Sequence, residues 1–381
     1  MEYDVIIIGA GSMGMSAGYY LTESGQKVAL IDSYDPPHEA GSHHGGTRLI
    51  RHAYGEGGNY VPLALHSQKL WEALDEKTEE RIFLRTGVLN FGVKGTVFLE
   101  TVKKSAETHQ LPLEVMTAEE INKRWPGFQL DDDSIGYFEK NSGVLFSENA
   151  VRTYRSLAVK NGADIYVNNT VQAIETNSNQ IAVKLTDGEI KGKKLLISAG
   201  KGTNQVTKLL GITLPLTPVR KTFSWFKTTK EMNYTEESFP GWGHIDDDST
   251  YYGFPSMDGT GIKIGRHDQG RPLVDPGKLE PFGTYPEDEQ ETLAFAHKYF
   301  SKDIELKEGR VCTYTNTPDA DFIIDYLPGH ANIIVACGFS GHGFKFASGI
   351  GESLARLLTE RESAVSLESF RLSRFDEIVD R

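Results

Sequence analysis

The fold of this chain is decided by the stretch Val5-Ile6-Ile7-Ile8-Gly9-Ala10-Gly11-Ser12-Met13-Gly14. Its four leading β-branched residues are typical of a strand buried on both faces of a parallel sheet. The glycines have the spacing G-x-G-x-x-G: Gly9 permits a tight turn, Gly11 lets the backbone approach a pyrophosphate, and Gly14 allows close helix–strand packing. The stretch therefore predicts a strand, a glycine turn and a helix whose N-terminus holds a nucleotide.

The residues that follow complete one βαβ unit. Residues 12–24 have helical composition, Gly25 suits the end of that helix, and residues 27–32 form a second strand. Asp32 ends this strand, where a carboxylate can bind ribose hydroxyls; an acid there argues against a 2′-phosphate. The alternative is a purely structural glycine turn, and the motif alone does not choose between FAD and NAD.

The rest of the chain alternates between two kinds of secondary-structure pattern. Strand and helix patterns of the parallel-sheet type return at 151–160, 194–200, 333–337 and 343–359. Short alternating strands at 88–92, 222–226, 251–254 and 262–265 separate them. We therefore expect a nucleotide-binding domain that is interrupted twice by a mostly antiparallel domain.

Composition limits the partners and the location. The 40 basic and 53 acidic residues give a net charge of −13, which disfavours nucleic acid and anionic membranes as partners. Only two cysteines occur, Cys312 and Cys337, and the first residues are acidic with no long apolar run. We expect a cytoplasmic protein. His43, His44 and His342 lack the spacing of a zinc site, so we expect no metal.

One segment indicates a family: Gly41-Ser42-His43-His44-Gly45-Gly46-Thr47-Arg48-Leu49-Ile50-Arg51-His52-Ala53-Tyr54-Gly55-Glu56-Gly57. It closely resembles the signature loop of the monomeric sarcosine oxidase and N-methyltryptophan oxidase family. Further similar segments lie at 143–147, 251–255, 312–325 and 338–346, so the resemblance covers nearly the whole chain. It implies a monomeric FAD-dependent oxidase that passes electrons from N-methyl amino acids to oxygen, releasing formaldehyde, hydrogen peroxide and the demethylated amino acid.

Within the family, residues 218–225, 327–330 and 370–375 resemble the N-methyltryptophan enzymes more than the sarcosine enzymes. Sarcosine, pipecolate and fructosyl amino acid oxidases remain alternatives. A dehydrogenase with another electron acceptor and a non-catalytic nucleotide-binding module are further alternatives.

The resemblance also implies the fold class: α/β (α+β with two domains), an FAD-binding Rossmann-like βαβ domain with an interleaved, mostly antiparallel substrate domain. We expect the FAD-binding domain at 1–85, 145–215 and 318–381. The substrate-binding domain is expected at 86–144 and 216–317.

The resemblance implies FAD attached through a thioether to Cys312; without it, a cysteine beside a strand is simply a small buried hydrophobe. Cys337 keeps that second interpretation. The residues expected to hold the cofactor are Gly9, Gly11, Gly14, Asp32, Thr47, Cys312, Gly341 and Lys345.

Arg51 and Lys345 match the family's clamp for the substrate carboxylate, and an arginine fork suits a planar carboxylate. Tyr314 and Tyr252 are expected to line the same pocket. Gly243 is expected to leave room for a bulky side chain, although a one-residue slip in the alignment would put Trp242 or His244 there instead.

The catalytic candidates are Lys263, Arg48, His44 and His267. Lys263 is flanked by isoleucines on a strand, so it points away from them; its default interpretation is a solvated lysine. The resemblance instead implies that Lys263 stabilises superoxide forming from oxygen. It places His44, Thr47 and Arg48 near the flavin ring, and His267 on the substrate side as a polar or orienting group.

Overall fold

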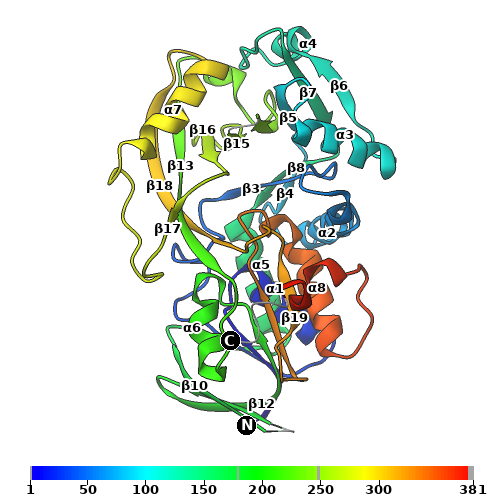
Figure 1. The fold of residues 1–381 in the computed structure, drawn as a ribbon, viewed down its shortest axis with the longest axis vertical. Coiled ribbons are helices and arrows are strands. Elements are labelled where there is room, and N and C mark those ends of the chain that lie inside the picture. The colour runs from blue at the N-terminus through cyan, green and yellow to red at the C-terminus, as the bar shows by residue number, and fades with distance from the viewer. Residues whose placement is uncertain (1, 178–179, 247–248, 376–381) are drawn as a thin grey trace.

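A computed structural model describes residues 2–177, 180–246 and 249–375. Within these residues the strands form three sheets, and Figure 1 shows a lower half with α1, α5 and α8, an upper half with α3, α4 and α7, and β3 and β8 between them. No helix of the described part is both long and apolar enough to cross a bilayer.

The first sheet has a parallel centre. Its strands are β1 (Glu2–Ile8), β2 (Val28–Ile31), β9 (Asp164–Tyr166), β10 (Val171–Thr176), β11 (Ile181–Leu185), β12 (Gly188–Ile197), β19 (Ile323–Tyr326) and β20 (Ile333–Cys337). The parallel neighbours run in the order β9, β2, β1, β12, β20, and β10, β11 and β19 add antiparallel edges. The first strand, β1, and the late strand β20 thus lie on either side of β12.

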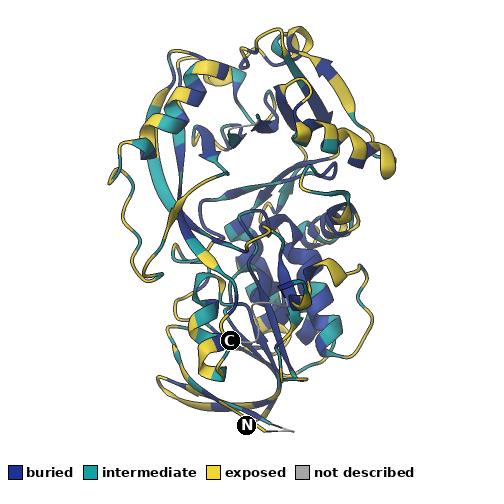
Figure 2. Cartoon of the chain, viewed as in Figure 1, coloured by how far each residue is buried: buried dark blue, intermediate teal, exposed yellow. Residues whose placement is uncertain are grey.

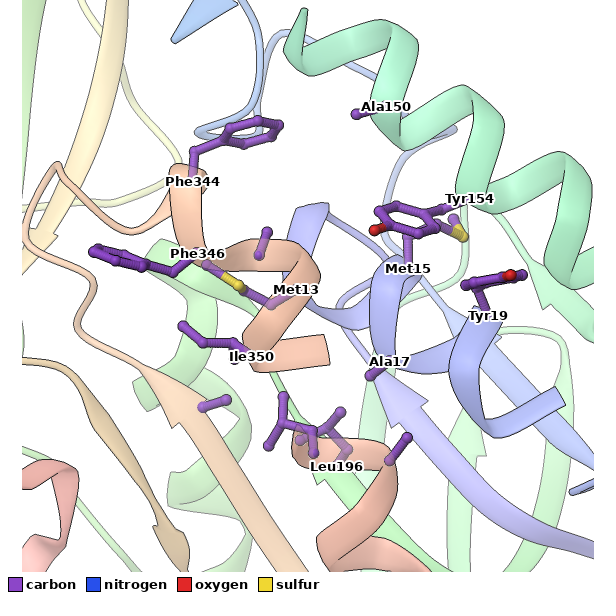
Figure 3. Packing of buried hydrophobic residues seen from close by; sticks show 14 of the residues in the cluster. Met13, Met15, Ala17, Tyr19, Ala150, Tyr154, Leu196, Phe344, Phe346 and Ile350 are labelled. Carbon is purple, nitrogen blue, oxygen red and sulfur yellow. The ribbon is translucent and has the colours of Figure 1, made fainter. Parts of the chain in front are cut away.

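Helices cover one face of this sheet. They are α1 (Ser12–Glu23), α2 (Val61–Asp75), α5 (Ser147–Lys160) and α8 (Ala347–Leu358), and α1 contacts both α5 and α8. Figure 3 shows Met15 and Tyr19 of α1 facing Tyr154 of α5, while Ile350 of α8 lies above Leu196 of β12. A fully buried core of this kind fixes the glycine turn at the start of α1.

The second sheet is mixed, with a single parallel pair, β5–β14, among its described pairings. Its strands are β5 (Val88–Val93), β6 (Glu114–Thr117), β7 (Ser134–Glu139), β13 (Thr217–Lys227), β14 (Gly241–Ile245), β15 (Thr250–Phe254), β16 (Ile262–Arg266), β17 (Arg271–Pro272) and β18 (Glu305–Asn316). Their order is β17, β13, β16, β15, β14, β5, β7, β6, with β18 also on β13. One face packs on an aromatic core, where Trp242 stacks on Phe295 of α7 (Glu287–Tyr299) at 5.2 Å.

A small third sheet of β3 (Thr47–Ile50), β4 (Phe83–Leu84) and β8 (Gly143–Phe146) carries the signature loop between the two large sheets. The helices α3 (Val97–Thr108) and α4 (Ala118–Arg124) lie in the upper half, and Figure 2 shows that they and α7 carry exposed residues, as do the hairpin and loops of the lower half. The short α6 (Thr203–Thr207) follows β12. Strand β8 crosses the expected boundary between residues 144 and 145, and the division into domains remains a prediction.

The α/β fold class is confirmed, but several element boundaries differ from expectation. The strand expected at 222–226 spans Thr217–Lys227, and three further elements differ as well. The helix expected at 151–160 begins at Ser147, whose Oγ donates to His43 O at 2.6 Å. The strand expected at 194–200 ends at Ile197, because the chain turns at Gly200 with a φ of 54°. The helix expected at 343–359 is split: the 3₁₀ turn Phe344–Phe346 precedes α8 and presents Lys345 to a cavity.

Candidate active site

Two adjoining cavities lie between the sheets. The first has a volume of about 440 Å³ and the second about 290 Å³. They share the lining residues Arg48, Tyr314, Gly341 and Phe344. The first lies at the carboxyl ends of the parallel strands, where ligands bind in open α/β sheets. The second lies against the second sheet, so a ligand in one cavity is next to a ligand in the other.

The glycine turn forms one wall of the first cavity. Gly9 has a φ of 96°, and a β-carbon there would collide with the Ser198 carbonyl. A β-carbon on Gly14 would collide with the Gly9 carbonyl oxygen and lie 3.0 Å from Ile7. Gly11 lines the cavity at the start of α1, whose first turn receives no side-chain cap. The uncapped N–H groups suit a phosphate.

Asp32 stands at the edge of the same cavity. Its Oδ2 accepts a hydrogen bond from the Ala10 N–H at 2.9 Å, and its Oδ1 accepts one from the Tyr34 N–H at 3.0 Å. These bonds fix the carboxylate directly after β2, where it lines the cavity with the glycine turn. The glycine cradle, the helix N-terminus and the acid together fit the adenosine diphosphate part of FAD.

The second cavity holds a buried cluster of cationic groups. Arg51 and Lys345 both line it, and both charges lie over the Tyr54 ring, at 4.7 and 5.0 Å from its centroid. Lys345 Nζ donates to Tyr54 Oη at 3.1 Å and to the His342 carbonyl at 3.2 Å. The structure therefore brings the two residues of the predicted carboxylate clamp into one cavity.

Glu56 occupies part of that clamp. Arg51 Nη2 donates to its two carboxylate oxygens at 2.8 and 3.0 Å. Arg51 Nη1 is buried and has no hydrogen-bond partner among the described residues. The sequence reasoning gave Glu56 no role. The only signal was an acid between glycines in the signature loop, and that pattern does not predict which cation it meets.

Burial controls the ionisation of this cluster. Burial, followed by the Arg51 charge, lowers the pKa of Lys345 to about 7. Burial lowers the pKa of His267 to about 4 and that of His342 to about 3, so both imidazoles are neutral at pH 7. Burial would raise the pKa of Glu56, but the Arg51 charge, with Lys345 beside it, outweighs this and lowers that pKa to about 2. The lowered pKa of Glu56 shows that the charges around this cavity favour an ionised carboxylate.

Lys263 lies beside the second cavity rather than in solvent. Ile262 and Ile264 pack in the aromatic core, so Lys263 points to the other face and is 2% exposed. Its Nζ donates to Gly45 O at 2.6 Å and approaches Thr47 Oγ1 at 3.3 Å. Burial, with help from Arg48, lowers the pKa of Lys263 well below its usual value.

Three aromatic rings surround the Lys263 ammonium. Its Nζ lies 4.6 Å from the ring centroid of Phe223, 4.9 Å from that of Phe254 and 5.5 Å from that of Trp225. The π faces favour the charged form and so oppose the effect of burial. The default interpretation of a solvated surface lysine is therefore wrong.

Cys312 lies on β18 and lines the second cavity as a buried free thiol. Burial raises its pKa, while the charges of Arg48 and Lys221 oppose that rise. Lys221 stands directly opposite Cys312 on β13 and donates to the carbonyls of Asp268 and Gln269. Cys337 is completely buried in the first sheet, as its strand pattern predicts.

The remaining catalytic candidates divide into two groups. Arg48 lines both cavities, and its guanidinium donates to three carbonyls, those of Ser42, His44 and Thr47. His267 lines the second cavity beside Tyr314, with ring centroids 5.6 Å apart. His44 and Thr47 are buried behind the walls and line neither cavity. Thr47 instead supports Lys263.

Gly243 lines the second cavity together with Tyr252, its register partner on β15, and Tyr314 lies nearby in the same wall. Trp242 and His244 point to the opposite face, where both pack on Phe295. The alternation of the strand thus shows which residue faces the cavity: the glycine does, and its two bulky neighbours do not.

Comparison with known proteins agrees with this geometry. The sequence profile described as FAD dependent oxidoreductase matches residues 4–357. A monomeric sarcosine oxidase of Bacillus sp. (strain B-0618) is 44% identical over 376 residues, covering 98% of this chain and 96% of the relative. An N-methyl-L-tryptophan oxidase of Citrobacter koseri is 43% identical, covering 98% and 100%. The L-proline dehydrogenase of P. horikoshii has the same fold, with a TM-score of 0.88, 21% identity and coverage of 100% and 99%.

Proposed function

We propose, from the premise that this chain belongs to the FAD dependent oxidoreductase family and groups with its sarcosine and N-methyltryptophan oxidases, that it oxidises N-methyl amino acids. The observation that carries this proposal is the pair of the half-buried Arg51 and the buried Lys345 in a cavity that adjoins the nucleotide cavity. The overall reaction consumes oxygen and water, and it yields the amino acid, formaldehyde and hydrogen peroxide.

When bound, FAD supplies the acceptor for the hydride equivalent that leaves the N-methyl group. The glycine turn with Gly9, Gly11 and Gly14 would hold its pyrophosphate, and Asp32 its ribose. Gly341 lines both cavities and would let the backbone approach the ring system. We include covalent attachment at Cys312 in the proposal, because its thiol is unpaired and faces the second cavity.

The protein's own contribution is placement and charge. Arg51 and Lys345 would fix the substrate carboxylate, and Tyr314 and Tyr252 would confine the rest of the molecule. The cations around the cavity disfavour a protonated amine, so they select the neutral amine that can lose hydride. Neutral His267 would orient the substrate rather than take a proton, since its pKa is lowered by burial to about 4.

Oxygen as the electron acceptor is supported by Lys263. A charge held among three rings and two backbone carbonyl oxygens is preorganised to stabilise superoxide as it forms. Arg48 would add positive charge at the boundary of both cavities. Thr47 would act by holding Lys263, whereas His44 would contribute through packing on Phe223.

The preferred substrate in this proposal carries a bulky side chain, with N-methyl-L-tryptophan ahead of sarcosine. The supporting observation is the missing side chain at Gly243 in the wall of the second cavity. An indole buried there would favour binding by about 2–3 kcal/mol, roughly 30–150-fold in kcat/KM. A Gly243→Met variant should lose that preference and keep sarcosine turnover.

Anaerobic titration tests the function. N-methyl amino acids should bleach the flavin, and air should restore its colour with one formaldehyde and one peroxide per turnover. Pipecolate and fructosyl amino acids serve as competing substrates. Bleaching without peroxide under air would identify a dehydrogenase, and the absence of bleaching by any amine would leave only a nucleotide-binding module. Gel filtration would test the expected monomer.

A further inference from the structure

Asn90 is a buried polar residue that the reaction described above does not use. It lies on β5 directly opposite Gly243 of β14, and both residues line the second cavity. Its neighbours on the strand, Leu89 and Phe91, point the other way into the aromatic core. Asn90 has no exposed surface. A carboxamide in such a position requires hydrogen-bond partners on both its nitrogen and its oxygen.

The nitrogen side of Asn90 has a partner, and that partner fixes the orientation of the amide. Asn90 Nδ2 donates to Glu139 Oε1 at 3.3 Å, and a carboxylate can only accept. Glu139 is itself held, because its Oε2 accepts from the N–H groups of His52 at 2.7 Å and Ala53 at 3.0 Å and from Ser142 Oγ at 3.2 Å. The amide cannot flip without placing its oxygen against this carboxylate.

The oxygen side of Asn90 has no partner. Within the described residues no group donates to Asn90 Oδ1, although this atom is buried. It lies 3.2 Å from the point where a β-carbon on Gly243 would stand, and Ile245 Cδ1 lies 3.6 Å from the same point. Phe98 and Leu49 also line this cavity. Beside Gly243 the cavity therefore combines apolar side chains with a fixed acceptor, Asn90 Oδ1, that has no donor among the described residues.

We propose that Asn90 determines specificity, by accepting a hydrogen bond at Oδ1 from an N–H group on the aromatic side chain of the N-methyl amino acid. This inference rests on the proposed function and names the substrate class of the same cavity. A flat apolar ring with a single donor, such as an indole, matches apolar side chains with an acceptor that lacks a donor within the described chain. A ring without a donor would leave the acceptor buried and unpaired, which is the stronger source of discrimination.

The test compares N-methyltryptophan with its benzothiophene analogue, in which sulfur replaces the indole N–H at nearly the same shape. The holoenzyme should prefer the indole compound by about 10- to 100-fold in kcat/KM. Asn90→Leu removes the acceptor at similar volume, and the ratio should fall to within about threefold, mainly through slower indole turnover. The kcat/KM for sarcosine should be nearly the same in the wild type and in Asn90→Leu, because sarcosine has no side chain to reach Asn90.

The matched control is Ser142→Ala, which disturbs the same Glu139 carboxylate without touching the cavity acceptor. It should keep the wild-type ratio. Equal turnover of the two ring systems by the wild-type enzyme overturns the assignment, and this result needs no variant that folds. A ratio that persists in Asn90→Leu overturns it as well. If no N-methyl amino acid, sarcosine included, reduces the flavin, the proposed function itself fails and this inference fails with it.

Discussion

Arg51 and Glu56 form an ion pair inside the cavity where a substrate carboxylate would bind, with Nη2 at 2.8 and 3.0 Å from the two carboxylate oxygens. The acid lies five residues after the arginine, in a turn that contains Gly55 and Gly57. Nη1 has no such partner among the residues that the structure describes, but a ligand carboxylate that binds the guanidinium through Nη2 must compete with this internal one. The apparent association constant is then the intrinsic constant multiplied by the fraction of protein in which Arg51 is free.

Glu56→Gln should therefore strengthen the binding of carboxylate ligands. We expect a dissociation constant for indole-3-acetate about tenfold lower than in the wild type, with kcat changed little, because the neutral amide competes less for Arg51. Flavin absorbance titration measures this. Glu80→Gln, which removes an exposed partner of Arg152, is the control. Unchanged or weaker binding in Glu56→Gln would contradict the competition.

Cys312→Ser should release the flavin on acid precipitation, whereas the wild-type precipitate should stay yellow. The reason is that a hydroxyl cannot replace the thioether, while the glycine turn and Asp32 would still hold the dinucleotide. The measurement is the absorbance of pellet and supernatant. Cys337→Ser serves as the control, because that thiol lies in the first sheet and lines neither cavity. Wild-type flavin found entirely in the supernatant would rule out covalent attachment.

Lys263→Met should separate the two half-reactions. Anaerobic flavin reduction by substrate should stay within about tenfold of the wild type, about 1.4 kcal/mol. Reoxidation by oxygen should slow far more, because the lost charge acts on superoxide. Stopped-flow absorbance measures both rates. The lowered pKa of Lys263 also predicts a pH dependence. Reoxidation of the wild type should slow as rising pH deprotonates the ammonium, and this should happen at a pH below the usual lysine range. Equal losses in both half-reactions would disprove this role.

Binding of indole-3-acetate, which has no amine, should weaken as the pH rises above about 7. Lys345 has its pKa lowered to about 7 by burial and by Arg51, so it is charged below that pH and neutral above it. The bound carboxylate favours the charged form and so raises this pKa in the complex. The dissociation constant should be flat below pH 7 and then rise. Lys345→Met should bind weakly with no such dependence, whereas Lys302→Met, at an exposed position, should keep it.

Strand periodicity explains why some site residues could be predicted. Alternation places Lys263 opposite Ile262 and Ile264, and the structure shows that arrangement. The same rule turns Gly243 towards the cavity. Asn90 obeys it too, but periodicity gives only the face on which a side chain lies. The contact between Asn90 and Glu139 depends on β7, which lies far away in sequence. Periodicity likewise does not reveal that Asn90 Oδ1 lacks a donor in the described part of the chain.

The loop residues could not be placed by such a rule. Glu56 meets Arg51 because the signature loop folds back on itself, and no sequence period describes that path. The 3₁₀ turn before α8 was missed for a similar reason. Trp71 Nε1 donates to the Lys345 carbonyl at 2.8 Å, a tertiary contact that helps fix the turn. The nucleotide-binding turn was the easiest part to predict, because its strand, glycines, helix and acid follow one another within residues 5–32.

The parallel order of the first sheet has a consequence for biosynthesis. Strand β1 finds one neighbour early, in β2, but its other neighbour is β12 and β12 pairs with β20, so the second edge of β1 stays open until residues 188–197 are made and the sheet closes only with residues 333–337. The first cavity also needs Gly338 and Gly341. At a translation rate of roughly 5–20 residues per second, the ribosome exposes the glycine turn many seconds before its cavity exists. Cofactor capture therefore follows synthesis of these late residues, and a nascent chain stalled before residue 330 should not retain FAD.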